Sequence, residues 1–319
     1  MKVDACHLGG VLPRSEALIA AYRRLAEGRE TYEAVKELAR HETEGLLKLQ
    51  KSLGMTYVVE GQLLWHDIFR PFSELLSGVK IGPLTRWFDN NLFYKKPIIV
   101  SNISRTTTIL DKYLFTELVR GLNWKLILPD PYTFYTLSLN QAYRQWEDLV
   151  LDIAGVIADE LRDLSDAQPA LVQLSAPCYS SGRPKPDHVE TMKEAFRKIK
   201  NSVDGETMIH LHFTDASNAI PWILDFPADI IGIDPYATNL DGLKGYSFRG
   251  SVAIGCLDAR NSYVESVDDV KEVFEMVAES LGARSYHLTT STDLEYLPKS
   301  VAEKKMRRLS EAYSALGGS

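Results

Sequence analysis

The stretch that decides the fold runs from residue 171 to residue 213. It contains LVQLS (171–175), then VETMKEAFRKIK (189–200), and then MIHLHF (208–213). The first and last of these segments are short apolar runs, which are typical of buried strands, whereas the middle segment has the apolar periodicity of a helix. A strand, a helix and a second strand in this order predict two parallel strands covered by a helix.

The same alternation extends in both directions along the chain. Further apolar runs are VDACHL (3–8), YVVE (57–60), KLILP (125–129), DIIGID (229–234), VAIGC (252–256) and SYHLTT (285–290). Helical periodicity lies between them, at 16–28, 32–54, 143–164 and 267–282, and a last helix is expected at 300–316. Eight such units in one chain favour a single (β/α)8 TIM barrel over an open sheet, with residues 1–319 forming one domain.

Residues 62–122 are too long for a simple connection and are predicted to form an insertion after strand two. Within it, KKPIIVSNI (95–103) indicates an extra strand. Its aromatic cluster favours a hairpin or flap over one mouth of the barrel and consists of Trp87, Phe88, Phe93 and Tyr94.

Composition limits the classes of function. The chain has 319 residues, of which 45% are hydrophobic and 25% charged, and its net charge is −7 with acids and bases interleaved. This balance argues against nucleic acid as a partner, and no apolar segment approaches the ~20 residues that span a bilayer, so no membrane role is expected. Cys6, Cys178 and Cys256 lie far apart without metal-site or redox spacing, which favours a reducing, cytoplasmic location.

Active sites of such barrels gather where the strands end, so the residues that close each run are the candidates. Most of them are polar: His7, Glu60, Gln62, Asp130, Ser175, Cys178, His210, His212, Asp234, Asp258, Arg260, Thr290, Ser291, Thr292 and Asp293.

The histidine pair His210 and His212 is the sharpest of these signals. Two residues apart on one strand, both side chains point to one face, and Asp234 ends the next strand. The three could form a two-histidine, one-carboxylate metal site with open positions. Alternatively, one histidine hydrogen-bonds a substrate or a carboxylate and the other completes the core.

Other candidates allow two interpretations each. His7 precedes Gly9 and Gly10, where the backbone either approaches an anion or makes a tight turn before a helix capped by Ser15. Gln62, Trp65, His66 and Asp67 either line a pocket or begin the packed flap. Asp258 and Arg260 either bind an anionic substrate group or form an ion pair, and the cysteines are either nucleophiles or inert buried thiols.

The order of the motifs resembles the cobalamin-independent methionine synthase family over nearly the whole chain. The resemblance rests on HLGGVLPRSE (7–16), YVVEGQLLWHD (57–67), LILPDPYTF (126–134), LVQLSAPCYS (171–180), IHLHF (209–213), IGID (231–234), LDARN (257–261) and STDLEYLP (291–298). It is strongest for the short, single-barrel members of archaea and some bacteria.

The resemblance implies methyl transfer to a thiol acceptor such as homocysteine, whose sulfur is bound as a thiolate by zinc. A corrinoid or folate-like carrier would supply the methyl group, and a methyl-carrier protein is a possible partner. The family's histidine and cysteine ligands fall here at His210 and His212, the glutamate ligand at Asp234, and the last cysteine at Thr292. Both thiolates are therefore replaced, so zinc or another divalent metal would be held, if at all, by nitrogen and oxygen ligands.

The family's acids that grip the amine of homocysteine are also replaced, by Gln62 and Ser175. Three hypotheses follow. The chain is a methyltransferase centred on His210, His212 and Asp234; or a zinc-less, non-catalytic partner of a catalytic paralogue; or a metal-free barrel enzyme related to uroporphyrinogen decarboxylase, with Arg14 and Arg260 binding a large anion.

Overall fold

The sheet contains eight parallel strands in a computed structural model that describes residues 2–88, 92–182 and 184–318. In sheet order the strands are β1 (Val3–Cys6), β11 (Leu281–Thr290), β10 (Tyr246–Leu257), β9 (Ile230–Ile233), β8 (Glu206–Leu211), β7 (Leu171–Ser175), β5 (Trp124–Pro129) and β2 (Val58–Val59). The eight apolar runs predicted from the sequence are these eight strands.

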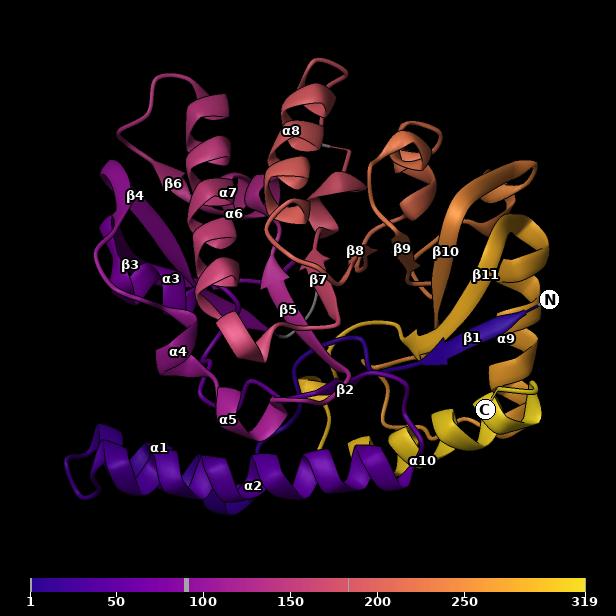
Figure 1. Ribbon diagram of the computed structural model, residues 1–319, viewed down its shortest axis with the longest axis horizontal. Helices are drawn as coiled ribbons and strands as arrows, with labels where there is room; N and C mark the ends of the chain where they lie inside the picture. Colours follow the sequence, from indigo (N-terminus) through magenta and orange to yellow (C-terminus); the bar gives the residue numbers. More distant parts are fainter. Residues whose placement is uncertain (1, 89–91, 183, 319) are drawn as a thin grey trace.

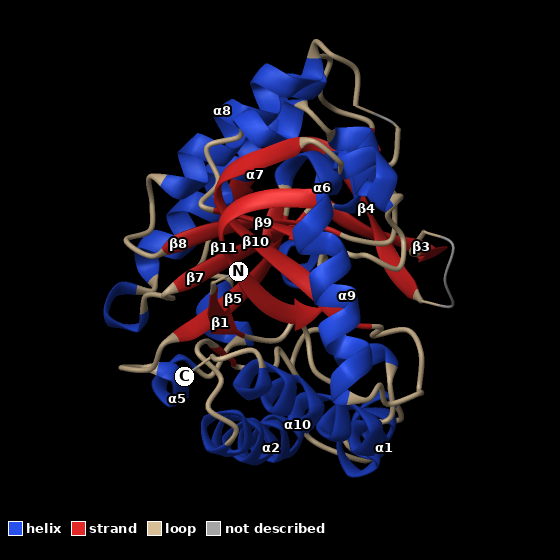
Figure 2. Cartoon of the chain, turned by 90° about the vertical axis from the view of Figure 1, so that its right-hand side faces the viewer, coloured by secondary structure: helices blue, strands red, loops and turns tan. Residues whose placement is uncertain are grey.

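The sheet is strongly curled (Figure 2), and contacts near its two outer strands, β1 and β2, bring them together. A parallel bridge joins His7, just after β1, to Tyr57, just before β2. The Thr56 backbone N–H donates to the Cys6 carbonyl at 2.9 Å, and the Cys6 N–H donates to the Thr56 hydroxyl at 3.0 Å. These contacts satisfy backbone groups that an exposed sheet edge would leave unpaired.

Six long helices cover the outside of the sheet (Figure 1). They are α1 (Glu16–Ala26), α2 (Tyr32–Ser52), α7 (Trp146–Asp163), α8 (His188–Lys200), α9 (Val267–Ser280) and α10 (Lys299–Ala315). Each begins and ends within a few residues of its predicted range. Shorter helices are α3 (Arg70–Leu75), α4 (Leu110–Tyr113), α5 (Thr116–Val119) and α6 (Pro131–Leu137).

The outer layer differs from a regular barrel after β8 and β9. Where a helix would follow each strand, the chain forms 3₁₀ turns, at η3 (Ala216–Ala219), η4 (Trp222–Asp225) and η5 (Leu240–Leu243). Pro221 and Pro227 break the first connection, because proline cannot donate the backbone hydrogen bond that a helix interior requires. Shorter 3₁₀ turns elsewhere are η1 (Ser165–Ala167), η2 (Pro177–Tyr179) and η6 (Leu294–Tyr296).

A second, three-stranded sheet lies beside the first. It pairs β3 (Leu76–Arg86) and β4 (Phe93–Arg105) as an antiparallel hairpin, and β4 with β6 (Leu139–Asn140). The extra strand expected at 95–103 lies within β4. The second sheet also recruits residues beyond the segment 62–122, since β6 follows β5.

The hairpin end packs over the carboxyl ends of the barrel strands. Trp87 and Phe88 contact the ring of Phe213, just after β8, with ring centroids 6.3 and 5.9 Å apart. Near the beginning of β4, the Lys95 backbone N–H donates a hydrogen bond to Asp67 at 3.1 Å. The hairpin therefore forms one wall of the region where the strands end.

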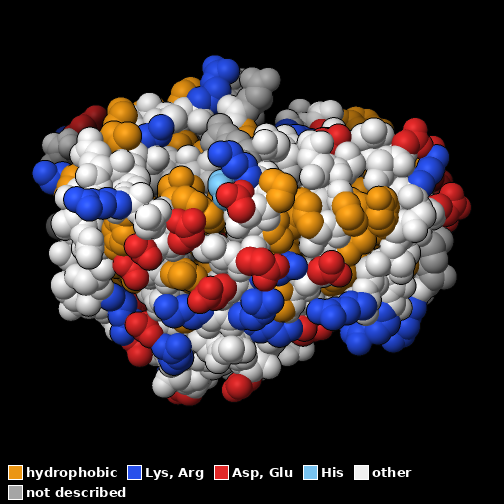
Figure 3. All heavy atoms as spheres, turned by 90° about the horizontal axis from the view of Figure 1, so that it is seen from above, with side chains coloured by type: hydrophobic (Ala, Val, Ile, Leu, Met, Phe, Trp, Pro, Cys, Tyr) orange, Lys and Arg blue, Asp and Glu red, His pale blue; other side chains and the backbone are white. Residues whose placement is uncertain are grey.

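The surface carries no single dominant sign of charge on the face seen in Figure 3, where basic and acidic side chains are interspersed. Such a face gives no strong field for steering a polyanion. Within the described residues, no helix has the length and apolar character needed to cross a membrane.

Candidate functional site

His212 lies at the centre of the polar residues where the strands end. Its Nε2 is 2.7 Å from the Ser175 hydroxyl, at the end of β7, and its Nδ1 is 3.1 Å from the Thr292 hydroxyl, just after β11. Burial, aided by the charge of Arg260, lowers the pKa of His212 to about 3. The ring is therefore neutral at physiological pH, with both nitrogens oriented by hydroxyl groups.

His210 lies on β8, two residues before His212 and deeper within the curled sheet. Its ring centroid is 4.9 Å from that of His212, and it is buried. Burial and the neighbouring His212 hold its pKa well below the usual range. In the described structure its Nε2 has no hydrogen-bond partner. The two histidines share one interior face, as their spacing predicted; His212 contacts the hydroxyls of Ser175 and Thr292, and His210 the backbone of Ser291.

The Asp234 carboxylate is bound by two backbone N–H groups and an arginine of the protein. It accepts hydrogen bonds from the backbone N–H groups of Phe213 (3.2 Å) and Tyr236 (3.1 Å), and the Arg260 guanidinium lies 3.4 Å away. Burial raises the pKa of Asp234 to about 6, opposed by Arg260. Arg260 also contacts Asp258, at 3.3 Å, so the three side chains form a chain of charges at the rim.

His7 belongs to a polar group enclosed by the curled sheet. Its Nε2 is 3.3 Å from His287 Nδ1, and its Nδ1 is 3.1 Å from the Lys125 ammonium. Lys125 also donates to the Leu8 carbonyl at 2.7 Å. Burial lowers the pKa of this lysine to about 7.

Gly9 and Gly10 allow β1 to approach the end of β11. The Gly9 N–H donates to the Thr290 hydroxyl at 2.8 Å, and a Cβ there would lie 2.7 Å from that oxygen. A Cβ on Gly10 would overlap the Asp293 carboxylate, which accepts the Val11 N–H at 2.8 Å. These backbone donors thus bind side chains of the protein itself.

Gln62, Trp65 and His66 lie at the opposite side of the mouth. Gln62 has a left-handed backbone (φ 52°), and its amide donates to the Ile127 carbonyl at 3.1 Å. The Trp65 indole donates to the Tyr113 carbonyl at 3.1 Å, and the His66 ring packs edge-on against Tyr22. Non-glycine residues with positive φ often mark functional sites, and Phe213 (φ 65°), beside His212, is a second example.

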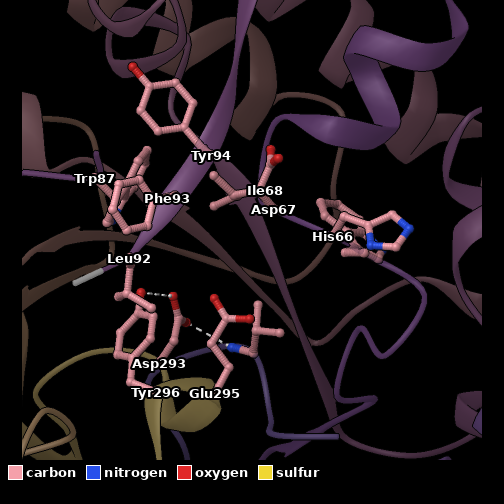
Figure 4. Close-up of a pocket in the computed structure, with 12 residues that line it drawn as sticks. His66, Asp67, Ile68, Trp87, Leu92, Phe93, Tyr94, Asp293, Glu295 and Tyr296 are labelled. Atoms are coloured by element: carbon pink, nitrogen blue, oxygen red, sulfur yellow. Dashed lines mark hydrogen bonds between the residues drawn. The ribbon is translucent and has the colours of Figure 1, made fainter. Parts of the chain in front are cut away.

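A cavity of about 140 Å³ lies between the hairpin and η6 (Figure 4). We call it the acidic–aromatic pocket. Its described lining residues are Val11, Trp65, His66, Asp67, Ile68, Trp87, Leu92, Phe93, Tyr94, Asp293, Glu295 and Tyr296. It adjoins the His212 group, because the Phe213 ring contacts both His212 (4.4 Å between centroids) and Tyr296 (6.0 Å).

Sequence reasoning missed much of this region. Asp293 was noticed only as the end of a strand run, and Glu295 and Tyr296 not as pocket residues, although the polar and aromatic segment STDLEYLP contains all three. Lys125 was missed because it occurs within the apolar run KLILP. Glu60 and Asp130 have structural contacts: Glu60 accepts the Gln62 and Phe115 N–H groups, and Asp130 caps α6 through Thr133.

The residues present do not fit the zinc site that the family resemblance implies. Among the described residues, no group of three or more His, Cys, Asp or Glu side chains is arranged to hold a metal ion. Cys6, Cys178 and Cys256 are buried thiols that form no disulfide within the described residues, and burial raises the pKa of Cys6 to about 12. The oxygens of Asp234 and the nitrogens of His212 already have partners within the protein.

Comparisons with known proteins agree on one family. The family described as "Cobalamin-independent synthase, Catalytic domain" matches residues 9–308. The methionine synthase of Saccharolobus solfataricus is 24% identical over 303 residues, covering 93% of this chain and 90% of that protein. The methionine synthase of Sulfurisphaera tokodaii is 24% identical over 301 residues, covering 93% and 88%.

Solved structures show the same fold. A B12-independent methionine synthase from Shewanella sp. W3-18-1, in complex with selenomethionine, has a TM-score of 0.80 at 16% identity and covers 99% of this chain and 98% of that one. A putative vitamin-B12 independent methionine synthase from Listeria monocytogenes has a TM-score of 0.75 at 16% identity, with both chains covered completely.

Proposed function

The chain belongs to the cobalamin-independent synthase family, and on that premise we propose that it transfers a methyl group to a thiol acceptor such as homocysteine. The observation that carries the proposal is the fixed group of His212, Ser175 and Thr292 where three barrel strands end. We also infer that the curled sheet is a closed (β/α)8 barrel, as the His7–Tyr57 bridge supports.

The hydroxyls and the neutral imidazole would bind the acceptor sulfur. In the neutral ring one nitrogen accepts a hydroxyl proton and the other donates its N–H, so the hydroxyl that accepts this N–H, of Ser175 or Thr292, keeps its own proton to donate to a thiolate beside His212. That hydrogen bond would favour the charged form of the sulfur. Arg260, partly exposed at the rim, would attract a carboxylate of the acceptor. The thiol gives its proton to solvent, the thiolate sulfur forms a bond to the methyl carbon, and the bond between the methyl group and the carrier breaks with its electron pair left on the carrier.

We derive no step through zinc, because the residues present do not form its site. The methyl donor, whether a corrinoid or a folate-like carrier, and a methyl-carrier protein as partner remain part of the proposal. The three cysteines, which form no disulfide within the described residues, support placing this activity in a reducing cytoplasm.

The test is methyl transfer to homocysteine and other thiols, from methylcobalamin or a methylated folate, with and without added divalent metals. We expect His212→Asn to lower kcat/KM by about 100-fold, a usual effect of removing a positioned catalytic group. His188→Gln is the matched control, since His188 also bonds a hydroxyl, that of Tyr132, but on α8 away from the site. Transfer undiminished in His212→Asn would exclude this assignment.

A second candidate is a zinc-less partner of a catalytic paralogue, which the absence of a metal-holding group within the described residues favours. It predicts no transfer by the chain alone with any donor and thiol, and a complex in gel filtration when both proteins are co-expressed. No complex at micromolar concentration would exclude it.

A further inference from the structure

The acidic–aromatic pocket contains negative charge that its described lining does not balance. Asp67, Asp293 and Glu295 line it, and none of the described lining residues is a lysine or an arginine. Burial raises the pKa of Asp293 to about 6, and burial together with the charge of Asp293 raises that of Glu295 to about 8. Asp293 is therefore charged at neutral pH, and Glu295 becomes charged above its pKa or when a bound cation stabilises its carboxylate. A low-dielectric cavity lined by one sign of charge concentrates ligands of the opposite sign.

The three carboxylates differ in what they can offer a ligand. Asp293 accepts hydrogen bonds from Val11 N–H (2.8 Å) and the Tyr296 hydroxyl (3.2 Å). Asp67 accepts them from backbone N–H groups of Phe69 and Lys95 and lies 3.5 Å from Arg70. In the described structure, Glu295 has no side-chain hydrogen bond or ion pair, and Figure 4 shows its carboxylate beside that of Asp293.

Aromatic rings supply the rest of the lining. Trp87 and Tyr94 pack edge to face with centroids 5.3 Å apart, and both also pack on Phe69, which fixes their positions. Phe93 is 49% exposed, so part of its ring is free to meet a ligand. The faces of such rings attract cations, above all those that carry little water.

These features select among cations. A metal ion needs several converging ligands, and no such group occurs among the described residues. A primary ammonium needs hydrogen-bond acceptors for three N–H groups, whereas Asp293 and Asp67 are largely occupied. A methylated onium group donates no N–H bond, spreads its charge over methyl groups, and is stabilised by ring faces and by carboxylates that need not touch it.

We propose that the acidic–aromatic pocket binds a methylated onium group, trimethylammonium or dimethylsulfonium, carried by a small molecule. The small volume of the pocket suits such a head group, with Glu295 and Asp293 supplying charge and Trp87, Phe93 and Tyr296 supplying ring surface. The inference concerns binding. If the protein binds the cation but transfers no methyl group, the binding inference stands and the proposed function is refuted.

Isothermal titration calorimetry with choline and its neutral isostere 3,3-dimethyl-1-butanol tests the role of charge. We expect choline to bind at least about tenfold more tightly. Trimethylsulfonium and tetramethylammonium then distinguish the two onium classes, and ethanolamine tests selection against a primary ammonium. Equal binding of the neutral isostere, tighter binding of ethanolamine, or no saturable binding of any onium ion at millimolar concentration would overturn the proposal.

Variants locate the site. At about pH 9, above the pKa of Glu295, Glu295→Gln should weaken choline binding by about tenfold and leave dimethylbutanol binding unchanged, since it removes charge without changing shape. Trp87→Leu should weaken choline binding by a similar factor. Glu303→Gln, on α10 and outside the pocket, is the control for loss of charge. Thermal melts check folding, and choline binding unaffected in a folded Glu295→Gln variant would refute the assignment.

Discussion

Gly10 shows how one missing side chain shapes the candidate site. Its Cα faces the Asp293 carboxylate so closely that any Cβ would overlap the Oδ1 atom. This carboxylate in turn holds the Val11 N–H and forms part of the acidic–aromatic pocket. The close approach of β1 to the end of β11 therefore depends on glycine at this position.

Replacement of Gly10 by alanine should displace Asp293 and break its bond to Val11. We expect a loss of about 2 kcal/mol in the free energy of unfolding, measured by urea denaturation, because a buried carboxylate and a buried N–H both lose their partner. Gly45→Ala is the control. Gly45 lies inside α2 with nothing near its Cβ position, so alanine there should stabilise by up to about 1 kcal/mol. A Gly10→Ala variant as stable as the wild type would contradict the packing described.

At this scale the sequence indicated where polar residues gather, but not their partners. The spacing of His210 and His212 correctly gives one shared face. That His212 would join Ser175 and Thr292 depends on the register of β7, β8 and β11, which no local pattern encodes. Glu295 and Lys125 escaped notice for the same reason, since their surroundings come from distant segments.

The helices that extend over several turns agree closely with the apolar periodicity of the sequence. The six long helices are present as expected, whereas β10 and β11 begin earlier than their predicted runs because residues 246–248 pair with residues 281–283 and so extend both strands. Tertiary pairing overrides propensity there. The 3₁₀ turns after β8 and β9 likewise replace helices that a regular repeat would require.

The hairpin of β3 and β4 depends on one buried anchor. Glu160 of α7, 1% exposed, accepts hydrogen bonds from Ile109 N–H (2.8 Å) and Leu110 N–H (2.7 Å) and pairs with Arg105, the last residue of β4, at 2.9 Å. Arg105 also pairs with Asp163, whose side chain is 45% exposed.

Glu160→Gln should therefore destabilise the protein by about 3 kcal/mol and increase hydrogen exchange in residues 93–110, because it removes the charge that three donors share. Asp163 pairs with the same arginine but is partly exposed to solvent. Asp163→Asn should therefore lower the free energy of unfolding by less than about 1 kcal/mol. Equal effects of the two substitutions in denaturation and exchange experiments would show that Glu160 is not the anchor.

The molecule as a whole encloses a polar interior. Lys125, His7, His287, Gln173 and His210 are all buried inside the curled sheet, above an apolar layer of Leu171, Met208, Ile230 and Ala253. Composition predicted a large core but not that its centre would contain a lysine. Stability therefore depends on the protonation of a side chain deep inside the barrel.

That dependence gives a prediction for pH. Burial lowers the pKa of Lys125 from 10.5 to about 7, so between these values the unfolded chain holds a proton that the folded protein has released. Stability contributed by this site should rise with pH from about 7 to 10.5. The stability of Lys125→Met relative to wild type should accordingly fall by on the order of 2 kcal/mol from pH 7 to pH 9. Denaturation at several pH values measures this, with exposed Lys48→Met as control; parallel profiles for Lys125→Met and wild type would contradict it.

The pairing of β1 with β11 has a consequence for biosynthesis. Val3 lies opposite Tyr286, so the first strand leaves the ribosome long before its neighbour exists. Until β11 is synthesised, one edge of β1 has no strand to pair with. β2 can already pair with β5, and the His7–Tyr57 bridge is the contact that then joins β1 to β2. If synthesis ends before residue 281, the chain lacks β11, and β1 cannot form its pairing with that strand. The apolar interior of the sheet then stays exposed to chaperones or to aggregation.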